Sequence, residues 1–322
     1  MSARIIGTGS YAPDNIVTND YLSTIMDTSD EWISSKTGIK ERRISQGEGT
    51  ASMATKAAIE AIKDAGISSE EIDFIVCGTC SPDNFLPSTA CEIQAEIGAV
   101  NATCFDLSAA CSGFIFGLQT ARAYIESGIA KTALVVGAEN LSKIMDWSDR
   151  TTCVLFGDGA GAAVVKKDEK DGGVIDVVTG SDGTGGPALC CPARDMNNLF
   201  IKNKFTTGFI KMDGHAVYKF AVTVVPDTIS EILKRNQLEV KDIKYFLLHQ
   251  ANKRIIESIS KRLHIDMDKL PMNLERYGNT SAASIAIILD EMNRDGCLKP
   301  GDKIVISGFG GGLTWGTALI EW

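Results

Sequence analysis

The feature that most constrains the fold of this 322-residue chain is an internal duplication. Residues 65–76 and 236–247 both read as a helix end, an acidic turn and an apolar strand, and they are 171 positions apart. Residues 132–137 and 303–308 repeat the same offset of 171. Because similarity at a fixed offset indicates a repeated structural unit, we expect two similar halves.

A third pair of segments shows where the two halves differ. Residues 159–165 resemble residues 314–320, but this offset is only 155, so the first half carries 16 extra residues between 140 and 156. Functional elaboration is concentrated in such loops.

Apolar strands alternate with amphipathic helices in both copies, which predicts α/β halves with helices covering the sheets. The polar segment 166–173 is the natural boundary between them. We therefore expect an N-terminal half over residues 1–170 and a C-terminal half over residues 171–322.

Composition excludes several classes of function. A net charge of −9 disfavours binding to nucleic acid, and no apolar run reaches the length of a membrane span. The N-terminus has no signal-peptide pattern, so we expect a cytoplasmic protein with its nine cysteines reduced. Cys77 and Cys80 have the spacing of redox and zinc motifs, but no second pair exists and the three histidines are not spaced as ligands, so we expect no metal site.

Cys111 is the candidate nucleophile. It lies between the short apolar run 104–107 and a segment with apolar residues at helical spacing, which places it at a strand-to-helix turn. Because a helix N-terminus stabilises an anion, we expect a lowered thiol pKa there. The alternative is a buried cysteine that acts only as a small hydrophobe. The apolar residues at helical spacing are Phe114, Leu118, Ala121 and Ile125.

Two further segments are candidates for the same site. His249 directly follows the apolar strand 245–248, and ligand-binding residues gather at the carboxyl ends of strands in α/β sheets. Residues 278–284 precede an apolar helix at the position that corresponds to Cys111 in the other half. Pseudo-symmetry predicts that these segments meet. Taken alone, His249 also fits a satisfied polar residue, and residues 278–279 fit a turn.

Seven motifs, taken together and in order, resemble the β-ketoacyl-acyl-carrier-protein synthase III family. They cover essentially the whole chain. The resemblance implies a thiolase-like αβαβα layered fold made of two duplicated halves, usually assembled as a homodimer. The motifs are residues 27–33, 37–39, 109–114, 156–161, 249–252, 278–284 and 310–316.

The resemblance also implies a reaction. Cys111, His249 and Asn279 match the catalytic set of the family, and the backbone N–H groups of Cys111 and Gly311 match its oxyanion hole. The family condenses a short acyl-CoA primer, usually acetyl-CoA, with malonyl-acyl-carrier protein and releases CoA and carbon dioxide. This is the initiating step of type II fatty acid synthesis. Acyl-CoA is a substrate, and no cofactor or metal is implied.

Three alternatives stay open at this point. A related condensing enzyme of polyketide or secondary acyl metabolism uses the same three residues. A thiol-disulfide protein acting through Cys77 and Cys80, and a catalytically silent module that binds a carrier protein, belong to other classes. The sequence assigns no role to the segment around Cys190 and Cys191, and it leaves primer preference and the protonation state of His249 undetermined.

The resemblance places the substrates as well. Trp32 and Arg150 would lie on either side of the CoA adenine, with Thr28, Lys36 and Asn252 nearby; Lys36 stands where some relatives have arginine. Leu86, within residues 85–87, would lie at the dimer interface and bound the primer pocket of the partner. The acidic carrier protein would bind the basic face of the helix after His249, which carries Lys253, Arg254, Lys261 and Arg262. The docking motif of the family matches Gln250, Ala251, Asn252, Lys253 and Arg254, and Lys219 is a further expected contact.

Overall fold

The computed structural model describes residues 2–170, 172–203 and 208–322. The elements of the first half are β1 (Ser2–Tyr11), β2 (Ile16–Thr18), α1 (Asn19–Ser23), α2 (Asp30–Thr37), β3 (Glu41–Arg43), α3 (Thr50–Ala65), β4 (Phe74–Gly78), α4 (Thr89–Ile97), β5 (Thr103–Leu107), α5 (Gly113–Glu126), β6 (Thr132–Glu139) and β7 (Gly159–Asp168). Those of the second half are β8 (Gly173–Ser181), β9 (Leu189–Cys190), β10 (Lys211–Met212), α6 (Gly214–Arg235), β11 (Tyr245–Leu248), α7 (Lys253–Leu263), α8 (Leu274–Tyr277), α9 (Ala283–Arg294), β12 (Lys303–Gly310) and β13 (Thr314–Glu321).

The duplication appears directly in the two main sheets. The first has the strand order β1-β7-β6-β4-β5, and the second, read from its β8 edge, has the order β8-β13-β12-β11. Read in these orders, the first two strand pairings of each sheet are antiparallel and the third is parallel. The parallel pairing is β6 with β4 in the first sheet and β12 with β11 in the second. The strands that the sequence pairs at an offset of 171 therefore occupy equivalent places.

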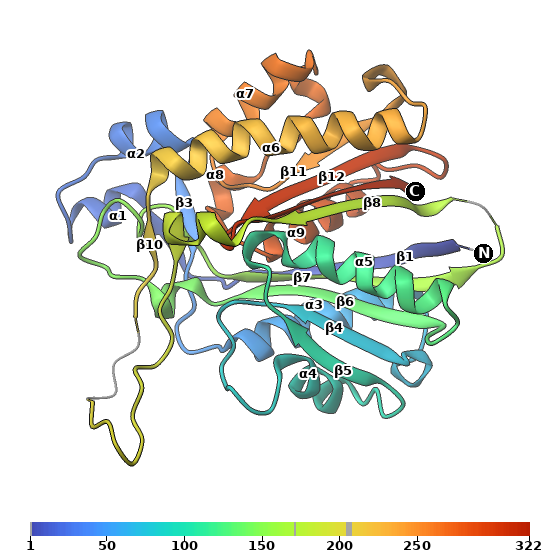
Figure 1. The fold of residues 1–322 in the computed structure, drawn as a ribbon, viewed down its shortest axis with the longest axis horizontal. Helices are drawn as coiled ribbons and strands as arrows, with labels where there is room; N and C mark the ends of the chain where they lie inside the picture. Colours follow the sequence, from blue (N-terminus) through green and yellow to red (C-terminus); the bar gives the residue numbers. More distant parts are fainter. Residues whose placement is uncertain (1, 171, 204–207) are drawn as a thin grey trace.

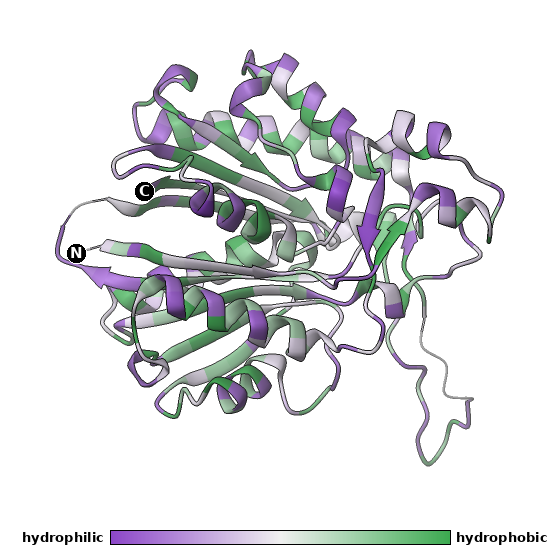
Figure 2. Cartoon of the chain, turned by 180° about the vertical axis from the view of Figure 1, so that it is seen from behind, coloured by the Kyte–Doolittle hydropathy of each residue, from purple (hydrophilic) through white to green (hydrophobic). Residues whose placement is uncertain are grey.

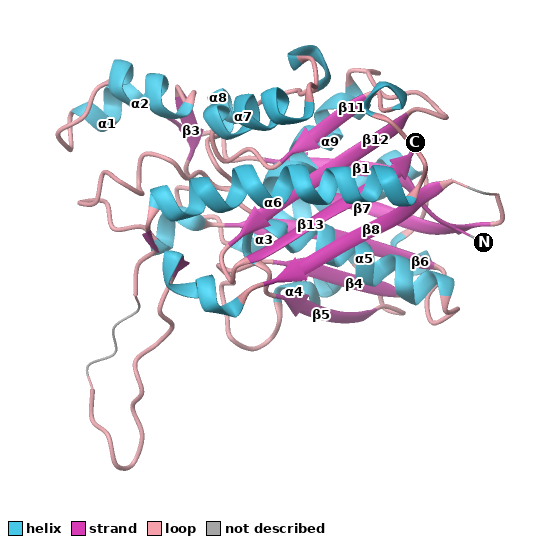
Figure 3. Ribbon diagram, turned by 45° about the horizontal axis from the view of Figure 1, so that its top comes forward, coloured by secondary structure: helices cyan, strands magenta, loops and turns pink. Residues whose placement is uncertain are grey.

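The layers follow from which helices cover which sheet face. Helices α5 and α9 lie between the two sheets, α3 and α4 cover the outer face of the first sheet, and α6 and α7 cover the outer face of the second (Figure 1). Figure 3 shows α6 lying across the strands of the second sheet. This is the predicted αβαβα arrangement.

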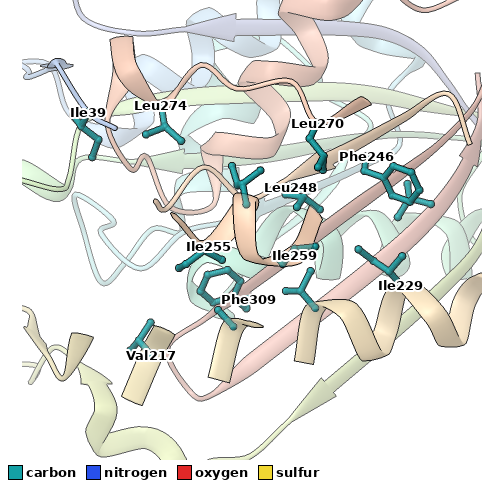
Figure 4. Close-up of a cluster of buried hydrophobic side chains, with 14 of the residues drawn as sticks. Ile39, Val217, Ile229, Phe246, Leu248, Ile255, Ile259, Leu270, Leu274 and Phe309 are labelled. Carbon is teal, nitrogen blue, oxygen red and sulfur yellow. The ribbon is translucent and has the colours of Figure 1, made fainter. Parts of the chain in front are cut away.

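Strand residues alternate between two apolar layers, as expected for sheets covered on both faces. In β11, Phe246 and Leu248 face α6 and α7, whereas Leu247 faces the central helices. Figure 4 shows the outer cluster, in which Ile229 of α6 and Ile259 of α7 pack near Phe246. Apolar residues are correspondingly concentrated along the strands and inner helix faces (Figure 2).

Close packing between the halves depends on a small residue in β6. A Cβ atom on Gly137 would lie 2.3 Å from the carbonyl oxygen of Ala282, which precedes α9. Glycine therefore allows the start of α9 to rest directly on the first sheet. This contact brings the loop 278–282 of the second half to the end of the first sheet where Cys111 lies.

One strand of the first main sheet, β5, has no counterpart among the described strands of the second main sheet. β5 is the edge strand of the first sheet, and its residues are mostly half-buried rather than fully buried. At the matching place the second half has the irregular segment 270–273, which contains Pro271 and cannot supply a full ladder of N–H donors. The side chain of Gln250 bonds this segment instead: its Nε2 donates to the Pro271 oxygen at 3.4 Å, and its Oε1 accepts from the Asn273 amide at 3.1 Å.

Two features lie outside the layers. Residues 191–203 and 208–210 form most of an arm that extends from the short β9–β10 ribbon away from the body (Figure 1), and Leu199 and Phe200 on it are 88% and 92% exposed. Strand β7 ends at Asp168 and β8 begins at Gly173; the predicted boundary at 170/171 falls partly on residue 171, which lies outside the described residues. Among the described helices, none has the length and apolar character needed to cross a membrane.

Candidate active site

Cys111 lies at a strand-to-helix turn, as predicted. β5 ends at Leu107, residues 110–112 form a 3₁₀ turn, and α5 begins at Gly113. Ala110 just before the cysteine has a positive φ of 44°, an uncommon conformation for a residue with a Cβ. The turn is held by Thr314 of the second half, whose hydroxyl donates to the Ala109 oxygen at 2.9 Å. The turn that carries Cys111 thus depends on both halves.

Strand β12 approaches the same turn very closely. A Cβ on Gly310 would lie 2.5 Å from the Cys111 nitrogen, so only glycine fits between the end of β12 and the turn. Gly311, predicted to contribute the second oxyanion donor, follows directly, and a Cβ there would lie 3.7 Å from Cβ of Ala110. Gly311 is therefore beside the Cys111 turn, and its role stays a prediction.

The expected lowering of the Cys111 pKa is wrong for this structure. Cys111 is 6% exposed, and burial raises the pKa of its thiol to about 12, which the charge of Glu139 reinforces. A hydrogen bond with Ser281 and the residue's own amide act in the opposite direction. A helix N-terminus contributes only about 0.3–1 kcal/mol at exposed positions, so desolvation of the thiolate dominates here.

His249 follows β11 and is 2% exposed. Its Nδ1 lies 2.7 Å from the Ser284 hydroxyl oxygen at the start of α9, and its ring packs edge-on against Phe309. Burial lowers the pKa of His249 to about 3, so the imidazole is neutral at physiological pH. Since Nδ1 is engaged by Ser284, Nε2 is the ring nitrogen left for a ligand.

Asn279 is held on three sides. Its backbone N–H donates to the Leu155 oxygen at 2.8 Å, and its carbonyl accepts from the Gly157 amide at 3.0 Å. Its side-chain Oδ1 accepts from the Ser281 amide at 2.8 Å. Within the described part of the chain Nδ2 has no hydrogen-bond partner, so the amide keeps donors available for a ligand.

The three residues meet in one cavity of about 230 Å³. The expectation that pseudo-symmetry brings the segments together is confirmed. Sequence reasoning missed several residues that line the cavity, because they are ordinary apolar or aromatic positions whose pattern carries no chemical signal. The lining comprises Lys36, Thr37, Cys111, Leu155, Phe156, Leu189, Met212, Gly214, Val217, Tyr218, His249, Ala251, Asn252, Ile255, Asn279, Phe309 and Gly310.

The predicted CoA contacts lie at and outside the mouth of this cavity. Lys36 and Asn252 line it, and Asn252 Nδ2 donates to the Lys36 oxygen at 3.2 Å. Farther out, the Arg150 guanidinium lies over the Trp32 indole, 5.4 Å from the ring centre. An adenine ring stacked between Trp32 and Arg150 needs about 3.5 Å on each face, so Arg150 must move outward to make room for it. Thr28 has a buried hydroxyl with no hydrogen-bond partner in the described chain.

The predicted carrier surface is only partly available. Lys253 and Arg254 begin α7 beside the cavity mouth, where Arg254 Nη2 donates to the Ser35 oxygen at 2.8 Å. Arg262 is paired with Asp227 at 2.7 Å. Lys219 and Lys261 are exposed. We define Lys219, Lys253, Arg254 and Lys261 as the basic patch.

Gln250 is a correction to the predicted docking motif. It is 1% exposed, and its side chain is occupied by backbone groups of Leu248, Pro271 and Asn273. A buried amide in this position stabilises the segment 270–273 and has no surface to offer a partner protein. Asn252 likewise caps α7, accepting from the Arg254 amide at 2.8 Å.

The other cysteines and the loop 85–87 differ in how far they are buried. All nine cysteines are free thiols. Cys77 is fully buried within β4, and burial raises its pKa well above the usual value. Leu86 and Phe85 are 88% and 71% exposed, and Cys190 and Cys191 lie exposed at the base of the arm.

Comparison with known proteins shows the family to which this chain belongs. The chain matches the family described as 3-oxoacyl-[acyl-carrier-protein (ACP)] synthase III over residues 105–183, and the C-terminal part of the same family over residues 233–322. A beta-ketoacyl-[acyl-carrier-protein] synthase III of Clostridium botulinum (strain Okra / Type B1) is 54% identical over 320 residues, covering 99% of this chain and 98% of the relative.

A protein of the same name from Clostridium acetobutylicum is 54% identical, covering all of this chain and 99% of the relative. The crystal structure of 3-oxoacyl-[acyl-carrier-protein] synthase III from Aquifex aeolicus VF5 superposes with a TM-score of 0.92 at 44% identity, covering 99% of this chain and all of that one. The chain therefore belongs to the 3-oxoacyl-[acyl-carrier-protein] synthase III family and is an acyltransferase that catalyses the condensing step which initiates fatty acid synthesis.

Proposed function

We propose that Cys111, His249 and Asn279 carry out this condensation by two successive half-reactions in the cavity of about 230 Å³. The observation that carries the proposal is that these three polar residues, from separate parts of both halves, line one largely apolar cavity. The substrates are acetyl-CoA or another short acyl-CoA, and malonyl-acyl-carrier protein. The polyketide alternative is not favoured, given the full-length identity to synthase III relatives.

In the first half-reaction the Cys111 sulfur attacks the thioester carbonyl of acetyl-CoA. The carbonyl oxygen gains negative charge, for which the backbone N–H groups of Cys111 and Gly311 are the donors. The raised thiol pKa means that the proton leaves Cys111 as the thioester is attacked, rather than beforehand. The carbon–sulfur bond to CoA then breaks, the CoA sulfur takes up this proton so that CoA leaves as the thiol, and the acetyl group remains on Cys111.

In the second half-reaction the malonyl group loses its carboxylate as carbon dioxide. The electron pair of the broken bond forms an enolate, whose oxygen accepts hydrogen bonds from His249 Nε2 and Asn279 Nδ2. A neutral His249 suits this donor role, provided that the Ser284 hydroxyl donates to Nδ1. The enolate carbon then attacks acetyl-Cys111, and the bond to sulfur breaks to give the 3-oxoacyl-carrier protein and the Cys111 thiolate. A proton from solvent restores the thiol. Decarboxylation supplies the carbanion, so the proposed reaction needs no metal or redox cofactor.

We place CoA along α2, from Trp32 and Arg150 at the surface to Lys36 at the cavity mouth. The acidic carrier protein would bind the basic patch beside that mouth.

Exposed Phe85 and Leu86 and the free edge of β5 support a homodimer, because exposed apolar groups and unpaired strand edges favour association. We propose a cytoplasmic location. If Leu86 bounds the primer pocket of the partner, Leu86→Ala should change the relative rates with acetyl, butyryl and branched primers; unchanged ratios would remove it from that pocket.

Intact mass spectrometry after mixing with acetyl-CoA tests the central claim. One acetyl group should appear, map to Cys111 and be absent from Cys111→Ser. The other eight cysteines serve as internal controls. Labelling elsewhere in the chain, or an unchanged mass, would contradict the proposed nucleophile.

A further inference from the structure

A buried carboxylate with no role in the steps above lies beside the active site. Glu139 ends β6 and is 0% exposed. Its Oε1 accepts from the Ser281 hydroxyl at 3.0 Å and contacts Cys80 Sγ at 3.2 Å. Its Oε2 accepts from the hydroxyls of Ser81 and Thr79 and from the Cys80 amide. Glu139 thus joins the loop after β4 to the loop before α9.

The surroundings of Glu139 consist of neutral hydrogen-bond donors. Within the described residues Glu139 forms no ion pair with lysine, arginine or histidine. An unpaired buried carboxylate is costly unless hydrogen bonds compensate, and such costs concentrate at functional sites. The Ser81 oxygen already accepts from the Asn140 amide at 2.9 Å, so its proton is directed to Glu139. This arrangement requires an acceptor at position 139.

Ser281 connects this carboxylate to the catalytic cavity. Its backbone has a positive φ of 49°, which turns its N–H toward the Asn279 side chain and its hydroxyl toward Glu139. The hydrogen bond from the Ser281 N–H to Asn279 Oδ1 fixes the orientation of the Asn279 side-chain amide. Nδ2 is therefore left to donate to a ligand.

We propose that Glu139 is a positioning residue for the second half-reaction, acting through Ser281 to hold the Asn279 amide where it can donate to the enolate oxygen. This inference rests on the proposed role of Asn279. Glu139 Oε1 accepts from the Ser281 hydroxyl and so fixes the position of Ser281. The Ser281 N–H in turn donates to Oδ1 and fixes the Asn279 side chain. Acylation of Cys111 takes its oxyanion donors from the backbone and does not use the Asn279 amide, so loss of the Asn279 position should affect the second half-reaction far more than the first. The effect of Ser281 on the pKa of Cys111 is measured by the acetylation rate.

Glu139→Gln and Ser281→Ala are the informative variants. Glutamine fills the same volume but replaces one acceptor oxygen with an amide N–H₂, so it can no longer accept from Ser281 on one side and from Ser81, Thr79 and the Cys80 amide on the other. Ser281→Ala removes only the hydroxyl. Thr79→Val is the matched control, because it keeps the shape of the side chain and acts on the side of Glu139 away from Ser281. It removes the 3.3 Å bond to Glu139 Oε2 and the 3.2 Å bond from the Ser81 amide.

The experiment measures both half-reactions separately, as acetylation of Cys111 by acetyl-CoA and as carbon dioxide release from malonyl-acyl-carrier protein. Both informative variants should release carbon dioxide about tenfold more slowly, with acetylation within about threefold of the parent. Thr79→Val should leave both rates close to the parent values. A parallel fall in the two rates, a fall in acetylation alone, or no change would overturn the inference; if Glu139→Gln does not fold, Ser281→Ala decides.

Asn279→Ala separates failure of this inference from failure of the proposed function. If Asn279→Ala still releases carbon dioxide at the parent rate, the proposed role of Asn279 is wrong, and the inference falls with it. If Asn279→Ala is inactive in this step while Ser281→Ala and Glu139→Gln are not impaired, only the positioning role is overturned.

Discussion

The Nδ1 atom of His249 lies 2.7 Å from the hydroxyl oxygen of Ser284, and both residues are 2% exposed. The pair joins the end of β11 to the first turn of α9. The contact orients the ring, and the direction of this hydrogen bond decides whether Nε2 can donate to a substrate oxygen. Each half of the molecule contributes the N-terminal segment of one helix to the cavity. The segment before α5 contains Cys111, and the first turn of α9 contains Ser284, which contacts His249.

Ser284→Ala should lower the rate of decarboxylation about fivefold, because loss of one buried hydrogen bond costs about 1 kcal/mol and frees the ring to rotate. Acetylation of Cys111 should change little. Ser307→Ala is the matched control, since Ser307 is a buried serine of β12 whose hydroxyl bonds Thr317 outside the cavity lining. Equal effects of the two variants on carbon dioxide release would contradict the orienting role.

The lowered pKa of His249 makes a prediction about acid stability. The unfolded chain binds the histidine proton near pH 6.5, whereas the folded chain binds it only near pH 3. Stability therefore falls as the pH drops below about 6.5. Between pH 7 and pH 5 the free energy of unfolding should fall by about 2 kcal/mol less in His249→Asn than in the parent, as measured by urea unfolding. An equal fall in both proteins would mean that His249 titrates normally.

The raised pKa of Cys111 predicts how the free thiol reacts. Because the thiolate is the nucleophile, alkylation of Cys111 by iodoacetamide should rise about tenfold per pH unit, with no plateau up to pH 10. Site-resolved mass spectrometry measures the rate. A plateau below pH 8 would show that the helix N-terminus outweighs burial, as the sequence alone led us to expect.

Contact between Arg150 and Trp32 predicts a selective effect on CoA binding. Trp32→Ala and Arg150→Ala should each raise the KM for acetyl-CoA about three- to thirtyfold, because each removes one face of a stacking site. The KM for malonyl-acyl-carrier protein should stay the same. Arg122→Ala is the control, since Arg122 pairs with Glu126 on α5. A uniform rise in both KM values would count against an adenine site.

The basic patch predicts a salt-dependent interaction with the carrier protein. Arg254→Glu and Lys261→Glu should raise the KM for malonyl-acyl-carrier protein several-fold at low salt and less at high salt, because screening weakens the attraction. Malonyl-CoA as substrate should be unaffected by Lys261→Glu, which lies at the far end of α7. Equal losses with both substrates would place the defect in the cavity.

Much of the site was visible in the sequence because its chemistry depends on rare residues. Cys111 is next to small residues after a strand, His249 follows a strand, and Asn279 lies in a polar turn before a helix. The lining residues Leu189, Val217 and Tyr218 could not be predicted, since their types are common throughout the core. Gln250 was misassigned, because a docking motif and a buried bracing amide look the same in one dimension.

The sequence by itself determined the two-half architecture, because a 171-residue repeat of strands and helices can bury its apolar faces only in matching layers. It also supplied the cysteine, histidine and asparagine. Only the tertiary structure decided their chemical state: burial raised the Cys111 pKa and lowered that of His249, and contacts between segments far apart in the chain joined Glu139 to Ser281 and Ser284 to His249. Desolvation and long-range hydrogen bonds depend on which surfaces meet, and local patterns do not contain that information.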